Sequence, residues 1–441
     1  MIIRSRRVVT PRGVSDCAVH VEGGKILAII PSTQPRNADV IDVGDLVLSP
    51  GIVDPHVHGN EPGRTEWEGF ETLTRAAAAG GITTIVDMPL NSSPVTTTPH
   101  ALHLKLAAAS GKLHVDCAFH AGIIPENAWN LLPLLSSGVV GVKAFLMHSG
   151  IDEFPNVDES DLRVAMPVIA SSGLPLLVHA ELQTPVAQNI SGSARDYRTY
   201  LASRPRQWEN EAIALMIQLC REFRCRVHIV HMSSSEALPM LRAAKAEGLP
   251  MTAETCPHYL FFAAEEIPDG ATAFKCAPPI RERENNELLW SALREGVLDC
   301  IASDHSPCPP EMKHVASGDF LGAWGGIASL QWSLSIAWTY ARDHGGTLED
   351  LARWMSHNTA ALIGLEKQKG TIAAGCDADF VVWDPEVPFT VERSQILHRH
   401  KLTPYEGRTL YGKVHATYLR GEKVFDDGTL TQPIGQVLLR T

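Results

Sequence analysis

The stretch Gly51-Ile-Val-Asp-Pro-His-Val-His58 is a short apolar run of the β type that ends in two histidines. Seven similar runs follow it, and stretches rich in Ala, Leu and Glu separate them. Strands that alternate with helices pair in parallel through crossover helices. The eight predicted strands are Ile52–His58, Ile82–Met88, His114–His120, Val139–Phe145, Leu174–His179, Arg226–His231, Met251–Thr255 and Leu298–Asp304. Eight such units predict an α/β fold, a (β/α)8 TIM-like barrel.

The two ends of the chain differ from this central part. Residues 1–50 are short β-type segments broken by turns, and β-type sequence returns at Gly370 after the predicted helix Leu348–Leu365. We therefore predict that residues 1–50 and 367–441 form one small β-sandwich domain, and that residues 51–366 form the barrel. A length of 441 residues suits one large domain with a smaller neighbour.

The composition limits the kinds of partner. The chain has 38 Lys and Arg against 50 Asp and Glu, a net charge of −12, which disfavours nucleic acid or an anionic membrane and favours a small-molecule substrate. No apolar run approaches the roughly 18 residues that a membrane helix needs, and no export signal is visible. Nine scattered cysteines without a C-x-x-C pair indicate reduced thiols and a cytoplasmic location.

Candidate metal ligands stand at the ends of four predicted strands. His56 and His58, two positions apart on a strand, face the same side, although an isolated pair is as readily two surface histidines. His179, His231 and Asp304 end three further strands. Because the carboxyl ends of all barrel strands meet at one mouth, where active sites form, we expect these five side chains to converge on a metal site.

Lys143 lies inside the fourth predicted strand, where a buried ammonium is costly unless it is paired or modified. One interpretation is a lysine whose side chain extends past the strand end, so that its ammonium lies in solvent. The other is an amine that has added carbon dioxide, giving N6-carboxylysine, whose two oxygens bridge two metal ions. The neighbouring histidines favour the second interpretation.

These residues divide into two ligand sets. His56, His58, Lys143 and Asp304 would hold one divalent ion, and Lys143, His179 and His231 a second, about 3.5–4 Å away. Such a pair lowers the pKa of a shared water towards about 7 and so supplies a hydroxide nucleophile. Asp304 is then the general base and afterwards the general acid, and the predicted reaction is hydrolysis. The ligands favour zinc, and cobalt, manganese or iron also fit.

Four longer motifs carry a resemblance to a known family. They are His58-Gly-Asn-Glu-Pro-Gly-Arg-Thr-Glu-Trp-Glu-Gly-Phe70, Met88-Pro-Leu-Asn-Ser-Ser-Pro94, Glu254-Thr-Cys-Pro-His-Tyr-Leu260 and Ala323-Trp-Gly-Gly-Ile327. From Ser49 to Gly412 the chain resembles the cyclic-amide branch of the amidohydrolase superfamily, which comprises dihydroorotases, hydantoinases, dihydropyrimidinases and allantoinases, and most closely the allantoinases. The resemblance implies a two-metal site with a carboxylated lysine, and a homotetramer.

The residue at position 60 bears on the substrate. Dihydroorotases typically place an arginine there for the substrate carboxylate, whereas this chain has Asn60, which suits a neutral substrate such as allantoin, opened to allantoate. The candidate substrate-binding residues are Asn60, Asn91, His148, His258 and Cys276. The alternatives are a hydantoinase or dihydropyrimidinase, then a dihydroorotase, and outside enzymes a metal-free structural homologue, which the six intact ligands oppose.

Overall fold

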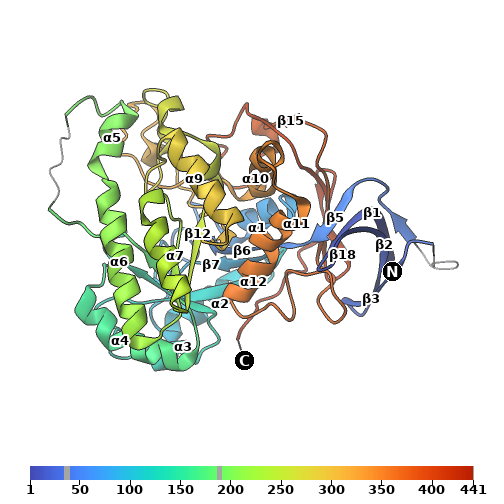
Figure 1. The fold of residues 1–441 in the computed structure, drawn as a ribbon, viewed down its shortest axis with the longest axis horizontal. Coiled ribbons are helices and arrows are strands. Elements are labelled where there is room, and N and C mark those ends of the chain that lie inside the picture. The colour runs from blue at the N-terminus through green and yellow to red at the C-terminus, as the bar shows by residue number, and fades with distance from the viewer. Residues whose placement is uncertain (34–39, 186–190, 441) are drawn as a thin grey trace.

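The centre of the molecule is a barrel of eight parallel strands. The computed structural model describes residues 1–33, 40–185 and 191–440, and the strands follow one another in chain order around the sheet (Figure 1). They are β6 (Ile52–Val57), β7 (Ile82–Asp87), β8 (Asp116–Gly122), β9 (Gly141–Phe145), β10 (Leu176–His179), β11 (Val227–Ile229), β12 (Met251–Thr255) and β13 (Cys300–Ile301). A parallel bridge between Val57 and His305 joins the two ends of the sheet and closes the barrel.

The predicted (β/α)8 fold is confirmed, and most of the predicted strand boundaries shift by one to three residues. All eight predicted strands exist, and most of their residues are buried because helices or side chains cover both faces of the sheet. The predicted strands Arg226–His231 and Leu298–Asp304 are too long, since β11 ends at Ile229 and β13 at Ile301. Beyond these points the regular strand geometry is interrupted, with positive φ angles at His231 and Asp304.

Helices surround the barrel (Figure 1). They are α1 (Phe70–Ala79), α2 (Pro99–Ala109), α3 (Leu132–Leu135), α4 (Glu159–Ser172), α5 (Tyr197–Ser203), α6 (Arg206–Phe223), α7 (Leu238–Ala246), α8 (Pro257–Phe261), α9 (Arg283–Arg294), α10 (Ser333–Ala341), α11 (Leu348–Ala352) and α12 (Asn358–Leu362). The predicted helix Leu348–Leu365 consists of α11, a π-helical turn and α12. None of the helices within the described ranges has both the length and the apolar character needed to cross a bilayer.

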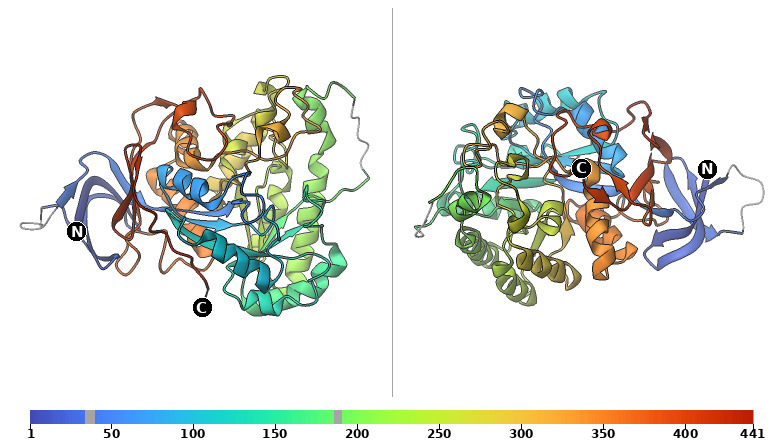
Figure 2. Two further views of the ribbon diagram at one scale, coloured as in Figure 1. Left: turned by 180° about the vertical axis from the view of Figure 1, so that it is seen from behind. Right: turned by 90° about the horizontal axis from the view of Figure 1, so that it is seen from above.

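Segments from the first and last parts of the chain form one sheet beside the barrel (Figure 2), and after this sheet the chain returns to the barrel, where Val437 pairs with Cys117. Its strands are β1 (Ile2–Thr10), β2 (Gly13–Glu22), β3 (Lys25–Pro31), β4 (Val40–Asp42), β5 (Val47–Pro50), β14 (Phe380–Asp384), β17 (Lys413–Leu419), β18 (Glu422–Asp426) and β19 (Thr429–Leu430). The short pair β15 (Phe389–Thr390) and β16 (Thr409–Leu410) is separate.

The end sheet encloses a core of its own. Apolar side chains from its early strands, such as Val19, pack in one cluster with side chains from its late strands, such as Phe380 and Tyr418. The strand β5 pairs with β1 on one side and with β14 on the other, which joins the two ends of the chain. Of the predicted small domain, residues 34–39 and 441 lie outside the described residues.

Candidate metal centre and active site

All six predicted metal ligands line one cavity of about 600 Å³, at the carboxyl ends of the barrel strands. These residues are His56, His58, Lys143, His179, His231 and Asp304. Three of them lie on strands, in β6, β9 and β10, where the backbone is fixed by pairing with its neighbours. The structure therefore brings together side chains that are up to 248 positions apart in the sequence.

His231 and Asp304 reach the cavity in a different way from the one predicted. Both lie beyond the strands, with φ angles of 39° and 44°. A left-handed backbone costs a residue other than glycine about 1–3 kcal/mol and persists only where surrounding contacts hold it. The N–H of His231 donates to Glu254 at 3.2 Å, and the hydroxyl of Ser306 donates to Oδ1 of Asp304 at 2.9 Å.

One half of the candidate centre gathers around Asp304. Its Oδ1 lies 3.2 Å from Nε2 of His56 and 3.4 Å from Nε2 of His58, and His231 lies within reach of the same ion. Burial alone would raise the pKa of Asp304, but the surrounding imidazoles hold it well below its usual value. Burial lowers the pKa values of His58 and His231. The shifts thus favour a carboxylate at Asp304 and neutral imidazoles at His58 and His231, the states in which these side chains bind metal.

The other half joins Lys143, His179 and His231. Nδ1 of His179 lies 3.0 Å from Nε2 of His231, and the ring of Phe145 stacks on His179 with centroids 4.5 Å apart. Nζ of Lys143 lies 4.9 Å from the centre of the Phe145 ring. It is fully buried and has no hydrogen-bond partner among the described residues, and burial lowers its pKa to about 8.

This donor set fits a pair of divalent ions. Neutral imidazoles and a carboxylate are ligands that first-row transition metals and zinc accept. The amine of Lys143 is buried on the cavity wall and has no hydrogen-bond partner among the described residues, so that the protein itself leaves this polar atom unsatisfied. A carboxylate formed on this amine would remove the unpaired ammonium and would add oxygen ligands to the imidazoles already present.

A buried glutamate supports the Asp304 half from behind. Oε1 of Glu254 lies 2.5 Å from Nδ1 of His56 and also accepts from the N–H of His231. Oε2 lies 3.0 Å from Nε2 of His228, which therefore contacts the glutamate on the side away from His56. Asp54 accepts from the N–H of His56 at 3.1 Å and orients its backbone.

Two of the candidate substrate-binding residues line the cavity. The Asn91 amide nitrogen lies 3.3 Å from Nδ1 of His58, and its Oδ1 is buried with no partner among the described residues. His148 lines the outer part, with its side chain 58% exposed and Nε2 3.4 Å from Asp152. Asn91 is thus fixed beside a predicted metal ligand, whereas His148 stands nearer to solvent.

The other three candidates are not among the residues that line this cavity. Asn60 is buried, with its amide 3.4 Å from the carbonyl of Pro307. His258 is buried with no partner at either ring nitrogen within the described part of the chain. The carbonyl of Cys276 accepts the Tyr200 hydroxyl at 2.7 Å, and the next residue, Ala277, lines the cavity instead.

Several cavity residues were not predicted. Gln183, Lys275 and His314 come from connections outside the barrel strands, and Arg204 from the short junction between α5 and α6. No periodic pattern marks a side chain that faces the site at such positions. Glu181 lies behind His179, with Oε2 2.8 Å from Nε2 of that ring. Glu181 stands two residues after the predicted ligand His179, and this spacing was the signal in the sequence that could have identified it.

Comparison with known proteins agrees with this geometry. Residues 47–424 match the model of the amidohydrolase family, and residues 2–45 match an allantoinase composite domain. The chain therefore belongs to the amidohydrolase family, and the resemblance seen in its motifs is confirmed. Members of this family generally bind a dinuclear metal centre.

Within the family the chain is similar to allantoinases. It is 51% identical to the allantoinase of Streptomyces avermitilis, over 100% of this chain and 98% of that protein. It is 45% identical to the allantoinase of Arabidopsis thaliana, over 97% and 88%. Among solved structures, the L-hydantoinase (dihydropyrimidinase) from Arthrobacter aurescens superposes with a TM-score of 0.93 at 32% identity, covering 100% of this chain and 99% of that one.

Proposed function

We propose that this protein is an allantoinase, which hydrolyses the hydantoin ring amide of allantoin to give allantoate. One observation carries the proposal: a chain 51% identical to an allantoinase holds all six ligand-type side chains around a single cavity. A cavity of about 600 Å³ is of the size that small-molecule sites have.

We propose two ligand sets for two divalent ions. His56, His58, Lys143 and Asp304 hold the first, and Lys143, His179 and His231 the second. Zinc suits these ligands, as do cobalt, manganese and iron. When bound, the ions supply a water of lowered pKa and polarise the scissile carbonyl.

Lys143 is proposed as N6-carboxylysine. Its neutral amine adds to the carbon of carbon dioxide and releases one proton, so that the new carboxylate offers one oxygen to each ion. The full burial of Nζ and its lack of a partner among the described residues support this assignment. The carboxylate would be satisfied where an ammonium is not.

Asp304 is proposed as the group that moves the proton. Its Oδ1 is held by the Ser306 hydroxyl at 2.9 Å and lies on the cavity wall. It accepts the proton of the attacking water and returns it to the leaving ring nitrogen. Among the candidate substrate contacts, the placement favours Asn91 and His148; Asn60, His258 and Cys276 remain predictions from the sequence.

The test compares substrates and metals together. Purified protein is assayed with allantoin, hydantoin, dihydrouracil and dihydroorotate, before and after chelation and re-addition of zinc, manganese or cobalt. We expect allantoin to be the preferred substrate and turnover to follow about two metals per chain. Preference for hydantoin or dihydrouracil would favour the second candidate, a hydantoinase or dihydropyrimidinase, which the superposition on the L-hydantoinase supports.

Three further properties belong to this proposal. A homotetramer is expected, and light scattering on the purified protein tests it. A cytoplasmic location is expected because all nine cysteines are free and buried. The domain boundaries proposed after residues 50 and 366 are supported by the apolar cluster that the two chain ends share.

A further inference from the structure

The junction between helices α5 and α6 places two charged side chains behind the metal site. Arg204 directly follows the last residue of α5, and Pro205 directly precedes the first residue of α6. Pro205 restricts the residue before it to an extended backbone, and Arg204 has φ −131° and ψ 76°. Glu209 follows in the first turn of α6. Arg204 and Glu209 therefore extend from one rigid corner of the chain.

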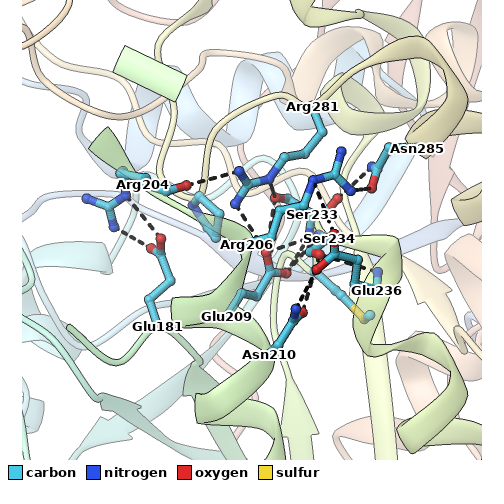
Figure 3. A network of polar contacts seen from close by, with 12 residues as sticks. Glu181, Arg204, Arg206, Glu209, Asn210, Ser233, Ser234, Glu236, Arg281 and Asn285 are labelled. Atoms are coloured by element: carbon cyan, nitrogen blue, oxygen red, sulfur yellow. Dashed lines mark hydrogen bonds and ion pairs between the residues drawn. The ribbon is translucent and has the colours of Figure 1, made fainter. Parts of the chain in front are cut away.

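Arg204 contacts Glu181 (Figure 3), and Glu181 in turn contacts His179. Nε of Arg204 donates to Oε1 of Glu181 at 3.1 Å, and its Nη2 donates to Oε2. The same Oε2 lies 2.8 Å from Nε2 of His179. Glu181 is 1% exposed and Arg204 18%. A two-pronged contact of this kind fixes both the position and the rotation of the carboxylate.

Glu209 acts on the loop that follows His231 (Figure 3). Its carboxylate accepts from the N–H of Ser233 at 2.7 Å and from the N–H of Ser234 at 3.0 Å. These residues lie two and three positions after His231. Asn285 holds the same loop by donating to the carbonyl of Ser233 at 2.7 Å.

Arg281 ties the two contacts together (Figure 3). Its Nη1 donates to the carbonyl of Arg204 at 3.0 Å, its Nε donates to the hydroxyl of Ser233 at 3.2 Å, and its guanidinium lies 3.7 Å from Glu209. Arg281 and Glu209 are each 2% exposed. Burying charges costs several kcal/mol per ion unless geometry repays it, which makes such a network a weak source of stability.

The contacts of Arg204, Glu209 and Arg281 support the half of the candidate centre that contains His179 and His231. His179 and His231 face each other 3.0 Å apart, and both are held from the α5–α6 junction. His56 is instead held by Glu254, which also contacts His228 and has no guanidinium partner in the described ranges. The two halves thus have separate supports, apart from the contact of Glu254 with the N–H of His231.

We propose that Arg204 and Glu181 are positioning residues for the second metal ion, the one assigned to Lys143, His179 and His231. Glu181 orients the His179 ring so that Nδ1 faces the cavity, and Arg204 locks Glu181 in place. Groups that orient a metal-binding histidine typically change metal affinity about 10- to 100-fold when removed. This inference rests on the proposed dinuclear site and names the residues that set the affinity of one of its two ions.

The experiment measures zinc binding rather than turnover. Chelated wild type and the variants Arg204→Gln, Arg204→Lys and Glu181→Gln are equilibrated with graded free zinc, and metal per chain is determined. We expect two ions in the wild type, and in Arg204→Gln and Glu181→Gln one ion at wild-type affinity and a second weakened about 10- to 100-fold. Arg204→Lys restores part of the loss because it keeps the charge but not the two-pronged geometry. Arg163→Gln, which removes an exposed arginine paired with Glu222, is the control and keeps both ions.

Each outcome separates the two claims. Two ions bound at wild-type affinity in both Gln variants would overturn the positioning role, and so would equal weakening of both ions. A wild type that does not bind two ions would overturn the dinuclear site itself. Circular dichroism and thermal unfolding identify a variant that fails to fold, and Arg204→Lys then carries the test.

Discussion

Lys369 donates its ammonium to Oδ2 of Asp116 at 2.6 Å, although 253 residues separate them. Asp116 begins the barrel strand β8, whereas Lys369 precedes the strand β14 of the end sheet. The same ammonium lies 2.9 Å from Asp377 and 2.8 Å from Asp379, and its side chain is 0% exposed. One buried cation therefore joins the barrel to the segment that leads into the end sheet.

Replacing this cation is expected to destabilise the whole protein. Lys369→Met leaves Asp116 and Asp379 buried beside each other, with the Arg420 guanidinium still on Asp116. Breaking one side of a buried ion pair typically costs about 3–5 kcal/mol. Chemical denaturation measures the change. Lys25→Met, which removes a half-exposed partner of Asp377, is the control and should cost about 0–1 kcal/mol. Equal effects of the two substitutions would contradict the claim.

The barrel could be predicted because buried parallel strands are continuous apolar runs that end at one mouth. His56, Lys143 and His179 follow from this rule, since each lies on a strand. His231 and Asp304 were expected at the mouth for the wrong local reason, because both stand after the strands in a left-handed backbone. Pairing rules on strands do not describe such turns.

The supporting residues could not be predicted in the same way. Arg204 lies at the α5–α6 junction and Arg281 in the segment before α9, and their contacts join residues 23 to 77 positions apart. Such contacts cannot be predicted from local periodicity, because they depend on how distant segments of the chain pack against the barrel. Glu254 and Glu181 are exceptions, because Glu254 lies on β12 one residue before its end and Glu181 two residues after the predicted ligand His179 that ends β10.

Lys313 is expected to hold the cavity wall together. Its buried ammonium donates to the carbonyl of Lys275 at 2.9 Å and to the carbonyl of Trp324 at 3.0 Å, and both of these residues line the cavity. Lys313→Met removes both of these hydrogen bonds and leaves the Lys275 carbonyl only the N–H of Gly326, at 3.0 Å. Each hydrogen bond to a charged group contributes about 1.5–3 kcal/mol. We expect KM for allantoin to rise about tenfold or more, with a smaller change in kcat. Steady-state kinetics of the metal-loaded variant and the wild type measures KM and kcat. An unchanged KM would contradict this role of Lys313.

Asp304→Asn is expected to remove the proton-transfer group. The amide cannot accept the proton of the attacking water, and general acid–base groups contribute about 10²- to 10⁴-fold to the rate. We expect kcat to fall within this range at saturating zinc, together with weaker metal binding because a ligand charge is lost. Asp427→Asn on the end sheet is the matched control and leaves kcat unchanged. A loss of kcat below tenfold would indicate that another group transfers the proton.

His398 is expected to make the protein sensitive to acid. Burial lowers its pKa from 6.5 to about 3, and the neighbouring His305 and Lys401 act in the same direction, opposed by Glu68. Between pH 6.5 and 3 the unfolded chain therefore binds a proton that the folded chain does not. Stability is lost as pH falls through this window, on the order of 5 kcal/mol at pH 3.

The variant His398→Leu tests this acid sensitivity. Both ring nitrogens of His398 lack partners among the described residues, so that an apolar side chain loses no hydrogen bond there. We expect the free energy of unfolding to fall less steeply between pH 6.5 and 4 than in the wild type. His100→Leu, at an exposed histidine, keeps the wild-type slope. Parallel slopes for His398→Leu and wild type would rule out this histidine as the cause.

Lys143→Ala is expected to abolish activity because it removes the group proposed to bridge the two ions. The deletion leaves a cavity beside the Phe145 ring, where Nζ stood 4.9 Å from the ring centre. A short carboxylic acid such as acetate or propionate can enter this space and offer two oxygens to the ions. We therefore expect metal content to fall well below that of the wild type, and both metal and turnover to return in part as the acid is added. A neutral amide of the same size is the control and restores neither. Full activity without added acid would show that Lys143 does not bridge the metals.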